Sequence, residues 1–225
     1  RFNETWAVTG GLRYTKDEKD GSESQRLVLL SPSLFGGAAA FDVSSDMDAA
    51  TPGVQNFRNL SGSWDAVTGS LDVDFTPDSD SLYYAKYSRG YKSGGFLLGT
   101  LAPQPQAKEE KVDAFEVGMK KTIARRLILN GSVFYNDYKD LQLNLQQLNA
   151  AATASANNFV NVDATAWGVE LEAQWQPTRA LQMSASYGYL NTEITKGCCF
   201  YDPADPSALL PGAKPAGGAA VTNGV

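Results

Sequence analysis

Charged side chains recur at alternating positions of several strand-like segments, where they could bind a charged ligand. They are Arg13, Glu116, Lys120, Glu170 and Glu172. Because side chains alternate between the two faces of a strand, the carboxylates of Glu170 and Glu172 share one face. Such a face could contact a substrate or another protein domain. The alternative is that these side chains are solvated and form cross-strand pairs along the same face.

The composition argues against catalysis and against a metal centre. The 225 residues include no histidine, so the usual general base and the commonest transition-metal ligand are both missing. Several aspartates could hold a hard cation, but their spacing matches no calcium-binding loop. They are Asp42, Asp46, Asp48, Asp202 and Asp205. We therefore predict no enzyme, no cofactor and no metal site.

The two cysteines, Cys198 and Cys199, are adjacent in the sequence. In an oxidising compartment they could form a strained disulfide with each other. They could equally pair with cysteines outside residues 1–225. The sequence leaves both arrangements open.

The stretch from Asp74 to Phe96 shows which elements would position these residues. Thr76-Pro77-Asp78-Ser79-Asp80 predicts a tight hairpin turn, with proline fixing φ at the first central position. Apolar and polar residues alternate on both sides of this turn, as in a strand between two different media. Tyrosines crowd the strand that follows it. Aromatic residues near strand ends are typical of the interfaces of a membrane barrel, whereas a soluble sandwich would bury Val, Ile and Leu.

The same alternation predicts seven strands along the chain. They span about residues 5–15, 64–75, 82–91, 113–122, 127–146, 161–175 and 181–191. In the fifth strand, Leu141, Leu143 and Leu145 are expected to continue in phase with the apolar positions from Leu127 to Tyr135. That strand is long enough to rise past an apolar band of ~25 Å and project into solvent. Residues 16–63 are only weakly periodic and are expected to form one large loop.

Short and long connections alternate between the predicted strands. Turns at residues 76–80, 123–126 and 176–180 are short, whereas the connections at 16–63, 92–111, 149–158 and after residue 195 are long. This alternation is typical of outer-membrane barrels, whose short turns are periplasmic and whose long loops are extracellular. A soluble β-sandwich, the more distant alternative, has no reason to sort its connections in this way.

We therefore predict an all-β fold, an antiparallel transmembrane β-barrel fragment with long extracellular loops. Because such barrels close with an even number of strands, about seven strands indicate a piece of a larger barrel. No run approaches the roughly 18 apolar residues of a spanning helix, and the first residues do not resemble a signal peptide. The net charge of -6 and the lack of a basic stripe argue against a nucleic-acid partner.

Five segments, in order, carry a resemblance to a known family. They are Thr9 to Thr15, Leu82 to Phe96 with its YSRGYKSGGF, Phe115 to Lys120, Phe134 to Leu141, and Trp167 to Glu172. These segments resemble the barrel of TonB-dependent outer-membrane receptors, nearest to the branch that takes up iron complexes. The resemblance extends from about Trp6 to Asn191.

The resemblance implies a barrel of about 22 strands that is plugged by an N-terminal domain. It also implies uptake of scarce ligands such as ferric siderophores across the Gram-negative outer membrane, with energy relayed by TonB. Residues 1–225 are accordingly expected to be a partial barrel domain, with the plug domain and the TonB box absent. Outer-membrane lipid, the TonB complex and an iron complex are the expected partners. A passive porin or a surface adhesin barrel is the alternative.

Overall fold

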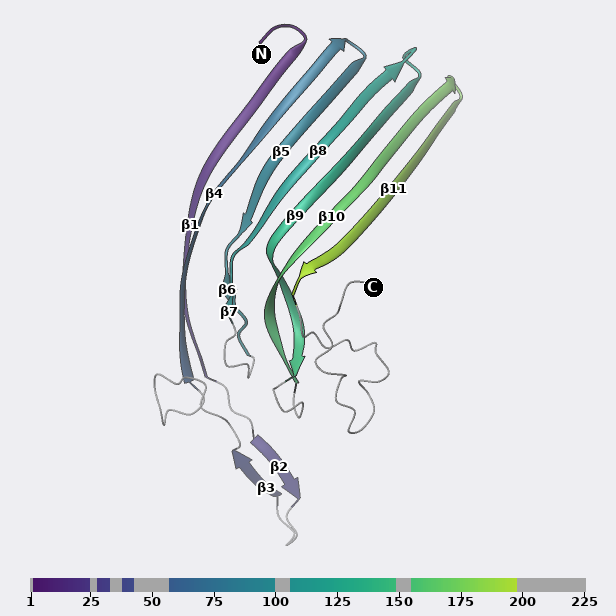
Figure 1. Ribbon diagram of the computed structural model, residues 1–225. Coiled ribbons are helices and arrows are strands. Elements are labelled where there is room, and N and C mark those ends of the chain that lie inside the picture. Colours follow the sequence, from purple (N-terminus) through teal and green to yellow (C-terminus); the bar gives the residue numbers. More distant parts are fainter. Residues whose placement is uncertain are drawn as a thin grey trace.

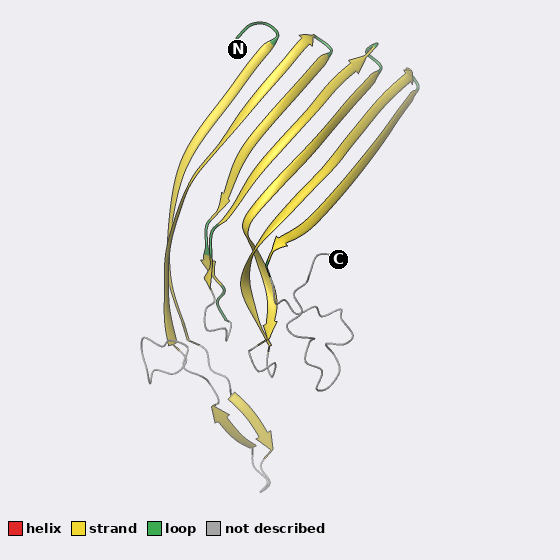
Figure 2. Ribbon diagram, in the orientation of Figure 1, coloured by secondary structure: helices red, strands yellow, loops and turns green. Residues whose placement is uncertain are grey.

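One open antiparallel sheet dominates the computed structural model, which describes residues 2–24, 28–32, 38–42, 57–99, 106–148 and 155–197 (Figures 1 and 2). Its seven strands are β1 (Trp6–Ser24), β4 (Phe57–Asp78), β5 (Ser81–Lys92), β8 (Glu110–Ile123), β9 (Leu127–Leu148), β10 (Ser155–Thr178) and β11 (Leu181–Lys196), paired in that order. Two small hairpins lie between them, β2 (Val28–Pro32) with β3 (Ala38–Asp42), and β6 (Gly95–Phe96) with β7 (Gln106–Ala107). The predicted all-β antiparallel fold is confirmed, and the sheet does not close into a barrel within this chain.

The cross-strand register gives the sheet one apolar face. On this face Val8 pairs with Val73, and Val117 pairs with Val133. Val117 is 55% exposed and Val133 is 48% exposed, although both lie in the middle of their strands. Such a face is stable only against apolar surroundings, which a bilayer supplies. We call this face the outer face and the opposite one the inner face.

Charged residues bound the apolar part of the outer face. On β8, Phe115, Val117 and Met119 lie between Asp113 and Lys121, which occupy the same face. The interval from residue 113 to residue 121 is eight residues. At ~3.3 Å per residue and a tilt of about 40°, it crosses ~20 Å, close to the apolar band of outer-membrane barrels. We call the limit at Lys121 the turn-side border and the limit at Asp113 the loop-side border.

Aromatic rings gather near both borders. Near the loop-side border, the ring centroids of Tyr87 and Phe115 are 5.0 Å apart. Near the turn-side border, those of Trp6 and Phe75 are 4.5 Å apart, and Phe75 lies 6.2 Å from Tyr83. Aromatic residues at both interfaces are a general feature of transmembrane barrels.

Three short turns join neighbouring strands at one end of the sheet, as predicted, but the first turn differs in detail (Figure 1). Its central residues are Ser79 and Asp80, and Pro77 lies within β4 instead of in the turn. Proline cannot donate to the ladder, and the β4–β5 register is irregular between Phe75 and Asp78. The β10–β11 register is irregular in the same way, between Trp175 and Thr178.

The side chain of Asp78 holds this first turn together. Its Oδ1 accepts the backbone N–H of Asp80 at 2.9 Å, and its Oδ2 accepts the Ser81 hydroxyl at 3.2 Å. These bonds, with the Asp80 N–H first, hold the pKa of the Asp78 carboxyl below its usual range. The turn is therefore built by Asp78, not by the proline before it.

The predicted loop at residues 16–63 is wrong for much of its length. β1 continues to Ser24 and β4 begins at Phe57, paired residue by residue from Trp6↔Phe75 to Ser24↔Phe57. The β2–β3 hairpin lies beyond the loop end of the sheet (Figure 1). Beyond the membrane both faces of a ribbon can be polar, so the alternation that identified the membrane-spanning part of each strand is lost there. β5, β8, β10 and β11 also extend past their predicted ends.

The phase of β9 changes at a bulge, which corrects a second prediction. Asp140 has a left-handed backbone with φ 53, and the β9–β10 register is irregular where Tyr138↔Ala164 gives way to Leu141↔Val162. Aspartate tolerates this conformation better than most residues. Leu141 and the leucines after it are therefore out of phase with the apolar positions from Leu127 to Tyr135. Figure 1 shows β9 and β10 twisting strongly around each other beyond this region.

Buried apolar side chains in the described part of the chain lie on the loop side of the sheet. They are Trp64, Ala66, Ala107, Val162 and Ala164. The small protein core is thus formed where the strands leave the apolar band.

Within the described residues, no helix is long and apolar enough to cross a membrane.

Candidate functional site

Four of the five charged candidates lie on the inner face of the sheet's turn-side half. Lys120 pairs with Asn130, which pairs in turn with Glu172, so the three occupy one row of neighbouring strands. The amide of Asn130 donates to the Glu172 carboxylate at 3.4 Å. Glu170 lies two residues along β10 on the same face. Placement on one face agrees with the alternation in the sequence.

Glu116 lies on the same face, two rows farther toward the loop end. It pairs with Lys86, which pairs on its other side with Asp72. The Tyr84 hydroxyl donates to the Glu116 carboxylate. The row therefore alternates in charge across β4, β5 and β8, which is how the cross-strand pairing alternative would look. A ligand here would have to compete with these contacts.

Arg13 lies apart from the other four, near a concavity of about 340 Å³ on the loop side. The concavity opens where β5 separates from β4, just past their last ladder pair at this end, Gly69↔Arg89. Asp17 and Tyr91 also line it. Burial, and next the negative charge of Asp17, raises the pKa of Tyr91 to about 12. The structure thus divides the predicted candidates between two places.

Arg89 is a residue that the charge pattern did not single out. Its guanidinium donates to both carboxylate oxygens of Asp113, at 2.7 and 2.6 Å, and the Tyr87 hydroxyl donates to the same carboxylate at 2.6 Å. A bidentate arginine pair is geometrically specific. It fixes the edge of the concavity and ties β5 to β8 at the loop-side border.

The segment after β5 is held against the β1–β4 ribbon by packing and by charge. Trp64 packs so closely on Gly94 that a Cβ there would lie 2.2 Å from the indole ring. The ammonium group of Lys19 donates to Ser93 Oγ and to the Gly94 carbonyl, both at 2.7 Å. Farther along, the Gly99 amide donates to the carboxylate of Glu23 at 2.7 Å. The glycine at 94 is required because the ring leaves no room for a side chain.

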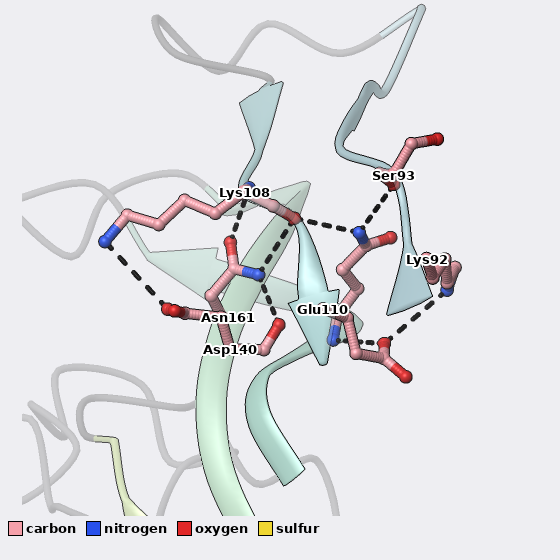
Figure 3. A network of polar contacts seen from close by, with 7 residues as sticks. Lys92, Ser93, Lys108, Glu110, Asp140 and Asn161 are labelled. Atoms are coloured by element: carbon pink, nitrogen blue, oxygen red, sulfur yellow. Dashed lines mark hydrogen bonds and ion pairs between the residues drawn. The ribbon is translucent and has the colours of Figure 1, made fainter. Parts of the chain in front are cut away.

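A polar network ties the same segment to β9 and β10 on its other side (Figure 3). The Gln142 amide donates to the carbonyls of Ser93 and Lys108, at 2.9 and 2.8 Å. Asn161 accepts the Lys108 amide at 2.9 Å and donates to the Asp140 carbonyl at 2.6 Å. The segment between β5 and β8 is therefore anchored at both ends of its path.

A second concavity, of about 900 Å³, follows the inner side of β9, β10 and β11 near the loop end. Its lining is largely apolar and aromatic and includes Phe134, Tyr138, Leu141, Leu143, Leu190 and Ile194. The bulge at Asp140 brings Leu141 and Leu143 to this side. The sequence alternation missed this surface because it assigned those leucines to the phase of Leu127.

These arrangements are surfaces that could contact a ligand. In the described residues, no group of three or more His, Cys, Asp or Glu side chains could hold a metal ion. Cys198, Cys199, Asp202 and Asp205 lie outside the described residues, as do Asp46 and Asp48. The inner face instead offers charged side chains in its turn-side half and two concavities near the loop end.

Comparisons with known proteins agree with this architecture. The family model described as TonB dependent receptor-like, beta-barrel matches residues 1–222. The pesticin receptor of Yersinia enterocolitica is 26% identical over 140 residues, which is 61% of this chain and 20% of that protein. The chain thus spans about a fifth of the length of the curated relatives that it matches.

Two solved structures share the fold. The ferric yersiniabactin uptake receptor FyuA from Yersinia pestis superposes with a TM-score of 0.60 at 20% identity, over 86% of this chain and 25% of that one. The copper transporter OprC gives a TM-score of 0.56 at 19% identity, over 86% of this chain and 28% of its own. With the family match over nearly the whole length, these observations identify the chain as a member of the TonB-dependent receptor β-barrel family, whose members are transport receptors of the Gram-negative outer membrane.

Proposed function

We propose that this chain is part of an active-transport receptor that takes up a ferric siderophore or a similar iron complex, with energy supplied through TonB. The observation that carries the proposal is the family match over residues 1–222. Similarity to a ferric yersiniabactin uptake receptor supports the choice of ligand class. The plug domain and the contact with TonB are expected in a region other than residues 1–225.

The inner face supports a path for a ligand of this kind. The apolar and aromatic concavity along β9 to β11 could receive the organic part of an iron complex near the loop end. The concavity beside Arg13 adds a guanidinium at the same end of the sheet. Four charged side chains lie farther toward the turn end, where they could contact the ligand or the plug. They are Glu116, Lys120, Glu170 and Glu172.

Uptake of radioactive iron by cells that express the full-length protein tests the proposal. A set of ferric siderophores would be offered to cells with and without TonB, in a host that lacks its own siderophore receptors. We expect saturable uptake of at least one complex that disappears without TonB. Uptake of many small solutes that does not saturate and does not need TonB would instead identify a passive porin. Attachment to surfaces without any uptake would identify an adhesin.

A pair of substitutions tests the role of Arg13 in the same assay. Arg13→Ala should raise the concentration needed for half-maximal uptake, because it removes one of the two cations that line the concavity and leaves only Arg89, which is paired with Asp113. Lys16→Ala is the matched control, since Lys16 is exposed on the outer face of the same strand. Equal effects of both substitutions would remove Arg13 from the proposed path.

We further propose that the short turns face the periplasm and that the loop end faces outside. In the full-length protein, single cysteines at Glu18 and Lys108 should react with a membrane-impermeant thiol reagent on intact cells. Both side chains are exposed at the loop end, Glu18 by 65% and Lys108 by 76%. A cysteine at Ser79, in the β4–β5 turn, should react only after the cells are opened. The reverse pattern would invert the orientation.

A further inference from the structure

Charge is distributed unevenly along the turn end of the sheet. The β4–β5 turn carries Asp78 and Asp80, whereas the β8–β9 and β10–β11 turns carry Arg125, Arg126 and Arg179. No Asp or Glu occurs in residues 117–136 or in residues 173–192. One part of this edge is thus acidic and the other is strongly basic. We call the three arginines the basic rim.

Backbone geometry brings the basic rim together. The guanidinium of Arg126 donates from Nη1 to the Pro177 carbonyl at 3.2 Å, so it reaches across to the β10–β11 turn that carries Arg179. The backbone pairs the same two turns, since the Gln176 amide donates to the Arg126 carbonyl at 2.8 Å. Ala124 and Arg125 both have positive φ, 51 and 55, which makes the β8–β9 turn tight. The three arginines therefore lie on two adjoining turns.

The carboxylate of Asp78, in the β4–β5 turn, is bound within its own turn. The Asp80 amide and the Ser81 hydroxyl donate to this carboxylate at 2.9 and 3.2 Å, and the Thr122 amide donates to the Asp80 carbonyl at 2.8 Å. The acidic turn is thus attached at Thr122 to the last residues of β8. The arginines of the basic rim are left with positive charge that the carboxylates on their own hairpins cannot offset.

An apolar strip on the outer face leads directly up to the basic rim. Ile123 pairs with Leu127, which pairs with Trp175, and Trp175 pairs with Met183. Trp175 is 47% exposed and Met183 is 50% exposed. A tryptophan at this level is typical of a membrane interface, where its ring spans the boundary between acyl chains and headgroups. Arginine forks match the geometry of phosphate oxygens.

From this combination we infer that the basic rim and the strip below it bind an anionic phospholipid of the adjoining leaflet. Its phosphate would lie among Arg125, Arg126 and Arg179, and an acyl chain would run along Trp175 and Met183. The choice of a phospholipid and not of a soluble anion follows from the continuity of the cations with the exposed apolar strip. The assignment to the periplasmic leaflet rests on the orientation proposed above.

Lipid binding to the purified full-length receptor tests the inference. The receptor in neutral detergent micelles would be titrated with dioleoyl phosphatidylglycerol or dioleoyl phosphatidylcholine, and bound lipid would be counted by native mass spectrometry. We expect the parent to bind phosphatidylglycerol more tightly, and the preference to weaken as salt is raised. The triple substitution Arg125→Gln, Arg126→Gln, Arg179→Gln should weaken binding of phosphatidylglycerol about a hundredfold, at roughly fivefold for each arginine near a membrane surface.

Two controls separate charge from folding. Asp78→Asn with Asp80→Asn alters the neighbouring turn and should leave the lipid preference unchanged. Replacing the three arginines with lysine keeps the charge but not the planar fork, and should weaken binding less than the glutamine variant does. If the glutamine variant does not fold, loss of the preference at high salt in the parent decides the question.

Three results would overturn the inference: equal binding of both lipids by the parent, unchanged binding by a folded glutamine variant, or an equal loss in the acidic-turn control. Binding in micelles depends on neither TonB, iron uptake nor membrane orientation. A failure here therefore leaves the proposed transport function standing, and a failure of uptake leaves this site standing.

Discussion

The membrane-spanning part of the sheet and its loop end are stabilised in different ways. In the spanning part, side chains such as Val117 and Leu171 remain about half exposed on a single layer of strands. At the loop end, Trp64 is 8% exposed and Ala107 is fully buried. The spanning part therefore depends on lipid and on its hydrogen-bonded ladder, whereas the loop end depends on packing within the protein. The same strands pass through both environments.

This difference predicts how substitutions in each part should change stability. A change on the outer face alters contact with lipid, and its effect depends on the charge introduced. A change at the loop end alters protein packing or hydrogen bonds, and its effect depends on shape and partners. The predictions below test this distinction in the full-length receptor.

The largest effect is expected at Trp64. Trp64→Ala should lower the free energy for local opening of the segment after β5 by about 3–5 kcal/mol, because it removes a buried ring that packs on Gly94 and Phe96. Hydrogen exchange of the Gly94 and Phe96 amides measures this opening. Leu98→Ala is the control, since Leu98 is 57% exposed. Equal exchange in the two variants would mean that the loop end has no packed core.

A charge on the outer face of the spanning part should have the next largest effect. Val133→Arg or Leu171→Arg should destabilise the barrel by roughly 2–4 kcal/mol, whereas Ser132→Arg and Glu172→Arg on the inner face should cost far less. Reversible unfolding in lipid vesicles provides the measurement. The two faces would be wrongly assigned if both pairs were destabilised equally.

A smaller effect is expected for the polar network at the loop end. Gln142→Leu removes both hydrogen bonds to the carbonyls of Ser93 and Lys108 and should favour local opening by about 1–3 kcal/mol. Limited proteolysis of the segment between β5 and β8 would detect it. Asn144→Leu, at an exposed position two residues farther along β9, should leave cleavage unchanged. If it accelerates cleavage as much, the network does not anchor the segment.

The smallest effect is a pH dependence of the β4–β5 turn. Because the folded pKa of Asp78 is lowered, the stability that its carboxylate gives is present above the unfolded pKa near 3.8. That stability is lost as the pH falls through the folded pKa. Protection of the Asp80 amide from hydrogen exchange should therefore decrease below about pH 4. Asp78→Asn should make protection independent of pH in this range; the same decrease in that variant would exclude Asp78 as its cause.

The spanning part could be predicted from the sequence because two media force side chains to alternate. Positions such as Val117 and Glu116 report the outer and inner faces directly, and the short turns delimit each hairpin. The strand extensions of β1 and β4 could not be predicted, since polar residues occur on both faces of the ribbon there and the segment that packs on it comes from after β5. Packing of Trp64 on Gly94 joins residues thirty positions apart, and no local pattern records it.

The charged candidates show the same limit. Alternation placed Glu116, Glu170 and Glu172 on one face, but it could not indicate that Tyr84 and Asn130 bind two of these carboxylates. Nor could it reveal that Arg13 lies beside a concavity on the loop side. Which of these side chains contacts a ligand stays a prediction.

The bulge at Asp140 reverses which residues of β9 face the inner side. If side chains alternated from Leu127 without interruption, Leu141 and Leu143 would lie on the outer face. The bulge places them on the inner face, where they line the concavity. Deleting the extra residue would make the β9–β10 ladder regular and leave these leucines on the inner side, whereas a regular strand that kept every residue would turn them toward the outside. The bulge, and not only the chemical type of the leucines, therefore decides which side of β9 they line.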